Sequence, residues 1–173
     1  MEVMKMKNML IKKLLQNRNF YYLAYGSNLN LYHMSSMSEN ARVVGTTELN
    51  GYRLVFRGSA DEYSYLTIEK CEGESVPLGI FSIPKSDLDV LDKYESYPRL
   101  YERVAMPVMV DGKEEKAYIY IMLPYFDYHL PSEFYLKRCQ EGYEDFEFDL
   151  NILNQALKTT KDSMPPSLKK KID

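Results

Sequence analysis

One carboxylate in this chain stands where an apolar side chain is expected. Within residues 86–95, Leu88 and Leu91 mark one face of a short predicted helix, and Glu95 falls on the same face. Glu95 also lies at the predicted C-terminal end of this helix, where the helix dipole disfavours negative charge. Both placements would raise the pKa of its carboxyl group above the ~4.3 of free glutamic acid, as a general base near neutral pH requires. The alternative is an exposed Glu95 on a frayed last turn ahead of Pro98.

A glycine turn is the second element that could take part in chemistry. The turn Tyr25-Gly26-Ser27-Asn28 follows an apolar run at residues 20–25. Glycine allows a positive φ and a close approach of the backbone to a ligand. Backbone N–H groups of such a turn point outward together and can hold a carboxylate or a developing oxyanion. Turns of this composition are common at strand ends, so a purely structural turn remains the alternative.

Two other kinds of site find less support in the sequence. A zinc site needs three or four ligands, whereas Cys71, Cys139, His33 and His129 form no motif with ligand spacing. The sequence therefore predicts no metal site. A serine hydrolase built on Ser27 and one of the histidines would lack both the G-x-S-x-G elbow and an evident orienting acid.

The elements that would position these residues are short helices interleaved with strands. Helices are predicted over residues 4–17, 31–37, 86–95, 132–141 and 150–157. Strands are predicted over residues 20–25, 42–57, 63–70, 76–83, 101–110 and 116–123. Ser86 and Asp89 have the spacing of a capping box, and Asp111-Gly112 is a strong hairpin signal. The sum is an α+β fold with mostly antiparallel strands.

Length and composition limit the class of protein further. A chain of 173 residues fits one domain, which we expect at residues 20–160, between a leader helix or extension at 1–19 and a disordered tail at 161–173. The net charge of −3 argues against a nucleic-acid partner, and no apolar stretch approaches the ~20 residues of a membrane span. Two lone cysteines fit a reducing compartment, so a cytoplasmic protein is expected. An apolar strand edge or the leader helix could support a homodimer.

Three segments of the chain resemble the γ-glutamylcyclotransferase family. Residues 22–29, Tyr-Leu-Ala-Tyr-Gly-Ser-Asn-Leu, resemble its N-terminal signature. Residues 91–95, followed by Tyr101 and Arg103, resemble its catalytic segment, and residues 131–135, followed by Glu141-Gly142, resemble its C-terminal helix. Their order and spacing agree with the family across about residues 20–157. The resemblance implies a small mixed, mostly antiparallel β-barrel with flanking helices and no metal or organic cofactor.

The resemblance also implies a cofactor-independent reaction on a small γ-glutamyl substrate. The γ-glutamyl amine or amino acid would cyclise to 5-oxoproline and release the free amine, with Glu95 as general base and acid. Substrate-binding positions are implied along the first signature and at three aromatic residues, namely Tyr22, Leu23, Ala24, Tyr25, Gly26, Ser27, Asn28, Tyr101, Tyr120 and Tyr135.

Two departures from the family pattern bear on the substrate. Ser96-Tyr97 follows the glutamate, where the family often has glycine. Bulky Tyr65 stands where a Gly-Gly pair often precedes the Thr-Ile strand, so it would change the accepted leaving amine. A noncatalytic relative that binds a small amine or carboxylate is one alternative, although the presence of Glu95 argues against it. A protein-interaction module is another alternative, although the 16 tyrosines of this chain are more typical of a β core.

Overall fold

A six-stranded sheet forms the body of the computed structural model, which describes residues 1–16, 18–60 and 63–169. The strand order is β4-β5-β1-β3-β2-β6. The strands are β1 (Asn19–Ala24), β2 (Arg42–Gly58), β3 (Ser64–Pro84), β4 (Tyr101–Val110), β5 (Lys113–Met122) and β6 (Asp127–Tyr128). All neighbours pair antiparallel except β1 and β5, which pair in parallel over two residue pairs. The predicted α+β class and the mostly antiparallel pairing are confirmed.

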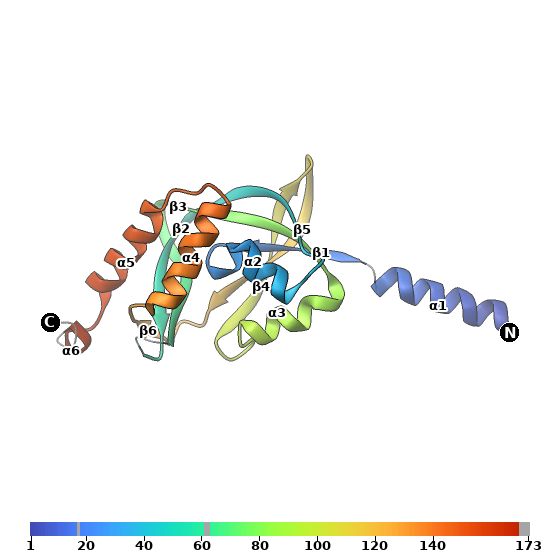
Figure 1. The fold of residues 1–173 in the computed structure, drawn as a ribbon, viewed down its shortest axis with the longest axis horizontal. Helices are drawn as coiled ribbons and strands as arrows, with labels where there is room; N and C mark the ends of the chain where they lie inside the picture. Colours follow the sequence, from blue (N-terminus) through green and yellow to red (C-terminus); the bar gives the residue numbers. More distant parts are fainter. Residues whose placement is uncertain (17, 61–62, 170–173) are drawn as a thin grey trace.

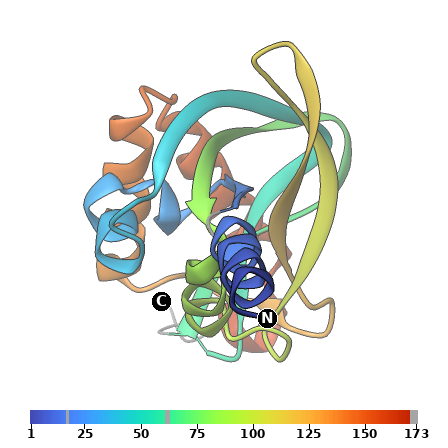
Figure 2. The same ribbon diagram turned by 90° about the vertical axis from the view of Figure 1, so that its right-hand side faces the viewer.

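The predicted barrel closure is wrong, because the sheet is open. Closure requires the two edge strands to pair, and within the described ranges β4 and β6 stand at opposite ends of the strand order. Strand β6 has only two residues and pairs with β2 alone. Figure 2 shows how strongly the long β2 and β3 curve around the interior without the sheet closing on itself.

One long strand replaces two that the sequence predicts. Apart from residue 63, the predicted strands at 63–70 and 76–83 both belong to β3, which runs for 21 residues beside the 17-residue β2. The register shifts between Asn50 and Tyr52, which pair with Ser75 and Lys70 respectively. Gly51 and Gly73 adopt φ values of +79° and +84° here, so glycine bends the ladder without ending it.

Short helices cover the ends and one side of the sheet. They are α1 (Glu2–Gln16), η1 (Ser27–Leu29), α2 (Leu31–Met37), η3 (Lys85–Asp87), α3 (Leu88–Tyr94), α4 (Glu133–Asp145), α5 (Asn151–Ser163) and α6 (Pro166–Lys169). Figure 1 shows α4 and α5 beside the curved strands and α1 projecting away from them. None of the helices that the structure describes is both long and apolar enough to cross a membrane.

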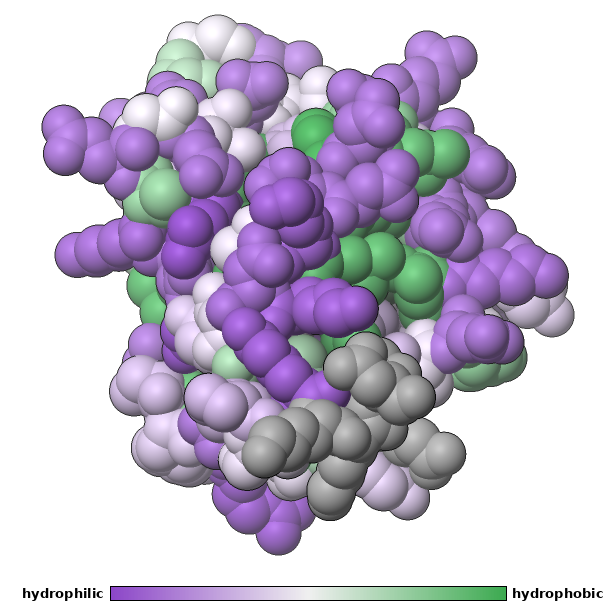
Figure 3. Space-filling model, turned by 90° about the vertical axis from the view of Figure 1, so that its left-hand side faces the viewer, coloured by the Kyte–Doolittle hydropathy of each residue, from purple (hydrophilic) through white to green (hydrophobic). Residues whose placement is uncertain are grey.

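The predicted leader helix corresponds to α1, although residue 17 lies outside the described residues. Its described apolar side chains, among them Val3, Met4 and Met9, are exposed. The homodimer that this helix could support stays a prediction. Figure 3 shows the opposite end of the molecule, over α5 and α6, as mainly hydrophilic.

The capping box predicted at Ser86 and Asp89 does not form. The turn η3 comes first, so α3 begins only at Leu88, and its N-cap Asp87 makes no side-chain cap bond. Ser86 donates its hydroxyl to Asp87 Oδ1 at 3.1 Å instead. The helix predicted from Ser132 does begin there, because Ser132 Oγ accepts the Tyr135 N–H at 3.2 Å.

The tail is more ordered than the sequence predicts. Helix α5 continues to Ser163, Met164 is only 2% exposed, and α6 follows. Lys169 Nζ donates to the Asp162 backbone oxygen at 2.8 Å, which ties the end of α6 to α5. The disorder expected after residue 161 is therefore wrong up to residue 169, and residues 170–173 lie outside the described residues.

Two close contacts attach α4 and α5 to the rest of the fold. In α5, Thr160 Oγ1 accepts the Phe56 N–H at 2.8 Å, so the helix takes a backbone donor from β2. In α4, Gly142 packs directly on η1, since a Cβ at this position would lie 2.6 Å from Asn30 N and 2.8 Å from Leu29 C. The Gly142 contact holds the C-terminal half of α4 against η1, which directly follows β1.

Candidate functional site

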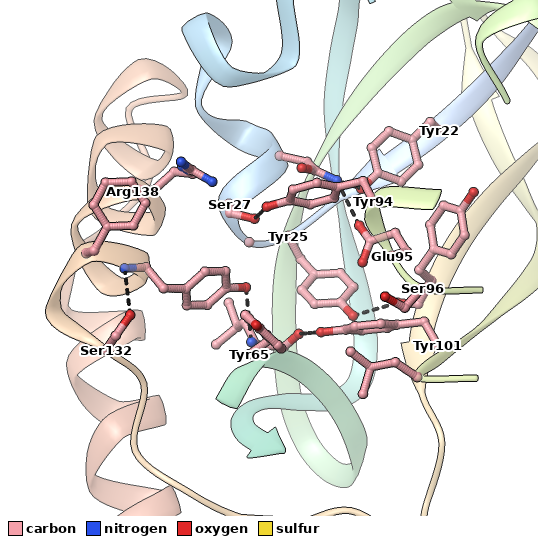
Figure 4. Close-up of a pocket in the computed structure, with 17 residues that line it drawn as sticks. Tyr22, Tyr25, Ser27, Tyr65, Tyr94, Glu95, Ser96, Tyr101, Ser132 and Arg138 are labelled. Carbon is pink, nitrogen blue, oxygen red and sulfur yellow. Dashed lines mark hydrogen bonds between the residues drawn. The ribbon is translucent and has the colours of Figure 1, made fainter. Parts of the chain in front are cut away.

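A pocket of about 400 Å³ opens where the β1–η1 turn, the end of α3 and the start of α4 meet. Eight of the 17 described residues that line it are aromatic, and Figure 4 shows several of their rings. The residues are Tyr22, Tyr25, Gly26, Ser27, Asn28, Tyr65, Leu66, Tyr94, Glu95, Ser96, Leu100, Tyr101, Tyr120, Ser132, Phe134, Tyr135 and Arg138. Eight of the ten predicted substrate-binding residues are among them, together with Glu95.

Glu95 caps the C-terminal end of α3, with its N–H donating to Leu91 O at 2.9 Å. Its carboxyl group turns into the pocket, where Asn28 Nδ2 donates to Oε1 at 2.8 Å (Figure 4). Burial raises the pKa of Glu95 to about 8, and the Asn28 hydrogen bond opposes that rise. The exposed alternative for Glu95 is therefore wrong. Removal from water is the main cause of this raised pKa.

Asn28 connects the glycine turn to the carboxylate. Its Nδ2 also donates to Tyr22 Oη at 2.8 Å, so one amide group fixes two pocket side chains. The Asn28 side chain is buried, and its Oδ1 has no hydrogen-bond partner in the described part of the chain. Burial and the Glu95 charge raise the pKa of Tyr22 well above its usual value, so its hydroxyl stays protonated.

Gly26 contributes to the pocket by having no side chain, and it does not adopt a positive φ. Its φ is −133°, so the positive φ expected at this turn is wrong. A Cβ would lie 3.4 Å from the Leu66 side chain and 3.5 Å from Tyr135 Oη, and both residues line the pocket. Glycine therefore keeps this side of the pocket open.

Ser27 has a tyrosine, not a histidine, as its hydrogen-bond partner. Its Oγ lies 3.0 Å from Tyr94 Oη, and either hydroxyl can donate. The ring of His33 packs on Tyr94 with 4.8 Å between centroids, but His33 is not part of the pocket lining. Burial lowers the pKa of His33 to about 4. The arrangement does not provide Ser27 with the adjacent base that a serine nucleophile needs.

Backbone groups of Leu66 hold two of the predicted tyrosines. Tyr101 Oη donates to Leu66 O at 2.7 Å, and Tyr135 Oη accepts the Leu66 N–H at 3.1 Å. Tyr65, which was expected to affect the accepted leaving amine, lines the pocket and packs edge-on against Tyr135, with ring centroids 5.1 Å apart. Aromatic rings from three elements thus form one wall.

A charged cluster behind the opposite wall holds Tyr120. Its hydroxyl donates to Asp92 Oδ1 at 2.6 Å, and Arg103 pairs with the other oxygen of Asp92. The Arg103 guanidinium lies 4.8 Å from the Tyr97 ring centroid. Tyr25 Oη donates to the Tyr120 backbone oxygen at 2.5 Å, so both tyrosines reach the pocket from fixed positions.

Two predicted residues do not reach the pocket. Leu23 and Ala24 are each 1% exposed and pair with Ile80 and Gly79 of β3. Their side chains belong to the core, because β1 continues through them before the turn begins. They were predicted to bind substrate because they lie within the continuous family signature at residues 22–29.

The sequence reasoning did not single out Leu66, Tyr94, Ser96, Leu100, Ser132, Phe134 or Arg138 as pocket residues. Among the described lining residues, Glu95 and Arg138 carry the formal charges. Arg138 follows Tyr135 by three residues on α4, and this helical spacing was a signal that could have found it. Within the described ranges, no three His, Cys, Asp or Glu side chains gather as a metal site would need.

Ser96 has an uncommon backbone conformation directly after Glu95. Its φ is +50°, in the left-handed region, and its carbonyl accepts the N–H groups of Arg99 at 2.8 Å and Leu100 at 2.9 Å. Glycine adopts this conformation without steric cost. Ser96, which stands where the family often has glycine, therefore occupies a turn position that glycine would adopt more easily.

Comparisons with known proteins agree with this architecture. The sequence matches the family described as gamma-glutamyl cyclotransferase, AIG2-like, over residues 22–138. A structure named gamma-glutamyl cyclotransferase is similar at 24% identity and a TM-score of 0.67, with 86% of this chain and 89% of that chain covered. An uncharacterized human protein, loc79017, has the same identity and coverage and a TM-score of 0.68.

YkqA from Bacillus subtilis is similar at 20% identity and a TM-score of 0.60, with 96% of this chain and 56% of that chain covered. At these identities the solved structures support the fold alone. No curated protein matches the chain. The family match covers more than half of the sequence and includes the glycine turn, Glu95 and the start of α4. The chain belongs to the gamma-glutamyl cyclotransferase, AIG2-like family.

Proposed function

We propose that this protein is a γ-glutamyl cyclotransferase that converts a γ-glutamyl amine or amino acid to 5-oxoproline and the free amine. One observation carries the proposal above all others. The Glu95 carboxyl group, with a pKa raised to about 8 by burial, lies in an aromatic pocket beside the glycine turn. A carboxylate of this basicity can exchange protons with an amine near neutral pH.

The first step is removal of a proton from the substrate. At neutral pH the α-amine of the glutamyl head is mostly an ammonium group and cannot attack. Glu95 in its carboxylate form accepts one proton, and the neutral nitrogen then bonds to the γ-carbonyl carbon. Ring closure is intramolecular, so correct positioning supplies much of the rate and no covalent intermediate with the enzyme is required.

The second step breaks the original amide bond. The attacking nitrogen gives up a second proton, and Glu95 delivers one proton to the departing nitrogen as the carbon–nitrogen bond breaks. The other proton ends on the released amine or in water. The lactam nitrogen keeps one hydrogen, so 5-oxoproline and a free amine are the balanced products.

The glycine turn would orient the glutamyl head during both steps. The backbone N–H groups of Ser27 and Asn28 donate to no other group in the described chain. They are therefore available to the carboxylate or carbonyl oxygens of the head, as preorganised donors are in acyl transfer. The buried tyrosine hydroxyls keep their own partners and limit the shape of the pocket.

Product analysis with matched variants tests this function. The purified protein is incubated with γ-glutamyl amino acids, γ-glutamylamines and glutathione, and 5-oxoproline and released amine are measured. Glu95→Gln should abolish turnover with the fold intact by circular dichroism, whereas Glu102→Gln, at an exposed glutamate on β4, should not.

Three results would contradict the proposal. Saturable binding without turnover of any substrate would favour the noncatalytic relative. Turnover that survives Glu95→Gln but is lost in Ser27→Ala would favour the serine hydrolase. Turnover that survives both changes would remove Glu95 from the chemistry and leave the mechanism without its base.

A further inference from the structure

The rim of the pocket contains a cation that the proposed mechanism does not use. Arg138 on α4 is half-buried and lines the pocket, and its guanidinium lies 4.8 Å from the ring centroid of Phe134. Phe134 is 71% exposed, so this pair marks the mouth. Figure 4 shows the Arg138 side chain reaching from α4 toward the space beside Tyr94.

No carboxylate of the described residues lies within ion-pair distance of Arg138. Arg103 provides the contrast, because it pairs with Asp92 behind the opposite wall of the pocket. A half-buried guanidinium without a counter-anion has lost part of its hydration, and its contacts with Phe134 and Tyr94 supply no opposite charge. An anionic group on a ligand would supply that partner in bidentate geometry.

Arg138 lies away from the reacting carboxylate. Figure 4 shows the two side chains on opposite sides of Tyr94. Besides burial, the Arg138 charge lowers the pKa of His33, and Arg138 also opposes the burial-driven rise in the pKa of Tyr94. Burial raises the pKa of Glu95, by contrast, and the Asn28 hydrogen bond lowers it. An anion bound at Arg138 would therefore sit apart from the amine that Glu95 deprotonates.

Bond lengths decide which substrate carboxylate fits that position. The α-carboxylate carbon of the glutamyl head is roughly 2.5 Å from the attacking nitrogen, so it must stay near Glu95. A carboxylate on a leaving amino acid lies beyond the scissile amide, roughly 5 Å from the same nitrogen. The leaving group also departs through the mouth, where Phe134 and Arg138 stand.

We infer that Arg138 binds the carboxylate of the leaving group, so that the preferred substrates are γ-glutamyl amino acids or peptides rather than γ-glutamylamines without a carboxylate. This inference rests on the proposed cyclotransferase function. Phe134 supports it by holding the guanidinium at the mouth, since arginine stacks favourably on aromatic faces. Arg138 is thus a specificity-determining residue, separate from the proton chemistry.

A pair of substrates that differ in one group tests the inference. γ-Glutamyl-alanine and γ-glutamyl-alaninamide have nearly the same shape, but only the first has a carboxylate on its leaving group. The wild-type protein should prefer γ-glutamyl-alanine by roughly 10- to 100-fold in kcat/KM, as expected for hydrogen bonds to a charged group. Arg138→Gln should remove most of this preference, mainly through KM, and change kcat/KM for the amide by no more than about twofold.

Matched controls separate the possible failures. Lys137→Gln removes the neighbouring exposed charge on α4 and should leave the preference intact. Equal losses on both substrates in Arg138→Gln, or no loss on either, would overturn this inference while the cyclotransferase proposal stands.

A third substrate identifies which carboxylate Arg138 binds. If Arg138→Gln instead removes discrimination against γ-glutamyl-alanine amidated at the α-carboxylate of its head, Arg138 binds the head and the inference is wrong. Absence of 5-oxoproline from all three substrates with the wild-type protein would overturn both proposals together.

Discussion

On the floor of the pocket the tyrosine hydroxyls already have hydrogen-bond partners, whereas on the α4 rim Arg138 has no counter-ion among the residues that the structure describes. Floor residues such as Tyr25, Tyr101 and Tyr120 are buried, and each donates its hydroxyl to a fixed acceptor. At the rim, Phe134 is exposed and Arg138 has no anionic partner among the described residues. The side chains of the floor are thus preorganised before a ligand binds, whereas Arg138 at the rim gains a counter-ion only from a bound ligand.

The difference separates two tasks within a single pocket. Preorganised groups that change little on binding are suited to a reaction common to every substrate, such as cyclisation of the glutamyl head. A rim with an unpaired cation is suited to distinguishing one leaving group from another. Changes on the floor should therefore affect all substrates alike, and changes at the rim should affect them selectively.

The largest effect is expected at Glu95. Glu95→Gln should lower kcat/KM by at least about 100-fold for every substrate, in agreement with the usual contribution of a general base. In the wild type, kcat/KM should rise with pH and level off above about 8, because only the carboxylate accepts the proton. A pH–rate profile of both proteins checks this prediction. If Glu95→Gln lowered kcat/KM for some substrates only, the distinction between floor and rim would be wrong.

The same residue should link activity to stability. The pKa of Glu95 is raised from 4.5 to about 8 on folding, so its contribution to stability is full below about 4.5 and is lost as pH rises through about 8. Glu95→Gln cannot titrate, so its free energy of unfolding should increase relative to wild type across that interval. Urea denaturation at several pH values measures the difference, and parallel curves for the two proteins would contradict it.

A smaller effect is expected where the rim helix meets the turn. Gly142→Ala places a Cβ within 2.8 Å of the Leu29 and Asn30 backbone, so the free energy of unfolding should fall by about 1–3 kcal/mol. Glu144→Ala, at an exposed position of the same helix, should change it little. Helix propensity alone predicts that Gly142→Ala stabilises, so a stabilised variant would show that α4 does not rest firmly on η1.

Asn28→Ala should shift the pH at which kcat/KM rises more than it lowers the maximal kcat/KM. Its hydrogen bond lowers the pKa of Glu95 against the effect of burial, so Asn28→Ala should move the rise in kcat/KM to higher pH. Activity at neutral pH should then fall roughly 10-fold, since less carboxylate is present. Ser27→Ala provides the comparison, because Ser27 bonds Tyr94 rather than Glu95. An unmoved or lowered inflection in Asn28→Ala would contradict the prediction.

The smallest effect is expected at Ser96. Ser96→Gly removes a side chain from a residue at φ +50°, which should stabilise the fold by less than about 1 kcal/mol after the entropy cost of glycine. Asp111→Gly, at φ +51° in the β4–β5 hairpin, should gain a similar amount away from the pocket. Thermal unfolding compares them, and a loss confined to Ser96→Gly would show that the serine side chain itself supports the floor.

Sequence reasoning succeeded where the signal was local. The periodicity of Leu88 and Leu91 placed Glu95 on the inward face of its helix, and the pocket contains it. The hairpin at Asp111-Gly112 and the helix start at Ser132 also depend on neighbouring residues, and both are found. For these elements a few consecutive residues carry most of the energetic preference.

Long-range geometry was the part that could not be predicted. Whether the sheet closes depends on strands far apart in sequence, and the two-residue β6 gives almost no pattern of its own. Arg138 becomes a pocket residue only because Gly142 lets α4 pack on η1. The positive φ expected at Gly26 is not adopted, and the two side chains beside this glycine, Leu66 and Tyr135, come from distant parts of the sequence.

Gly142 also limits how new substrate preferences can evolve on this scaffold. Because α4 packs directly on the backbone of Leu29 and Asn30, an outward shift of the helix to admit a larger leaving group would remove the packing that supports the turn. Enlargement by helix movement would therefore sacrifice the alignment of the glutamyl head. Diversification should proceed instead by exchanging single side chains at the mouth, such as Arg138, Phe134 and Tyr65, on an unmoving backbone.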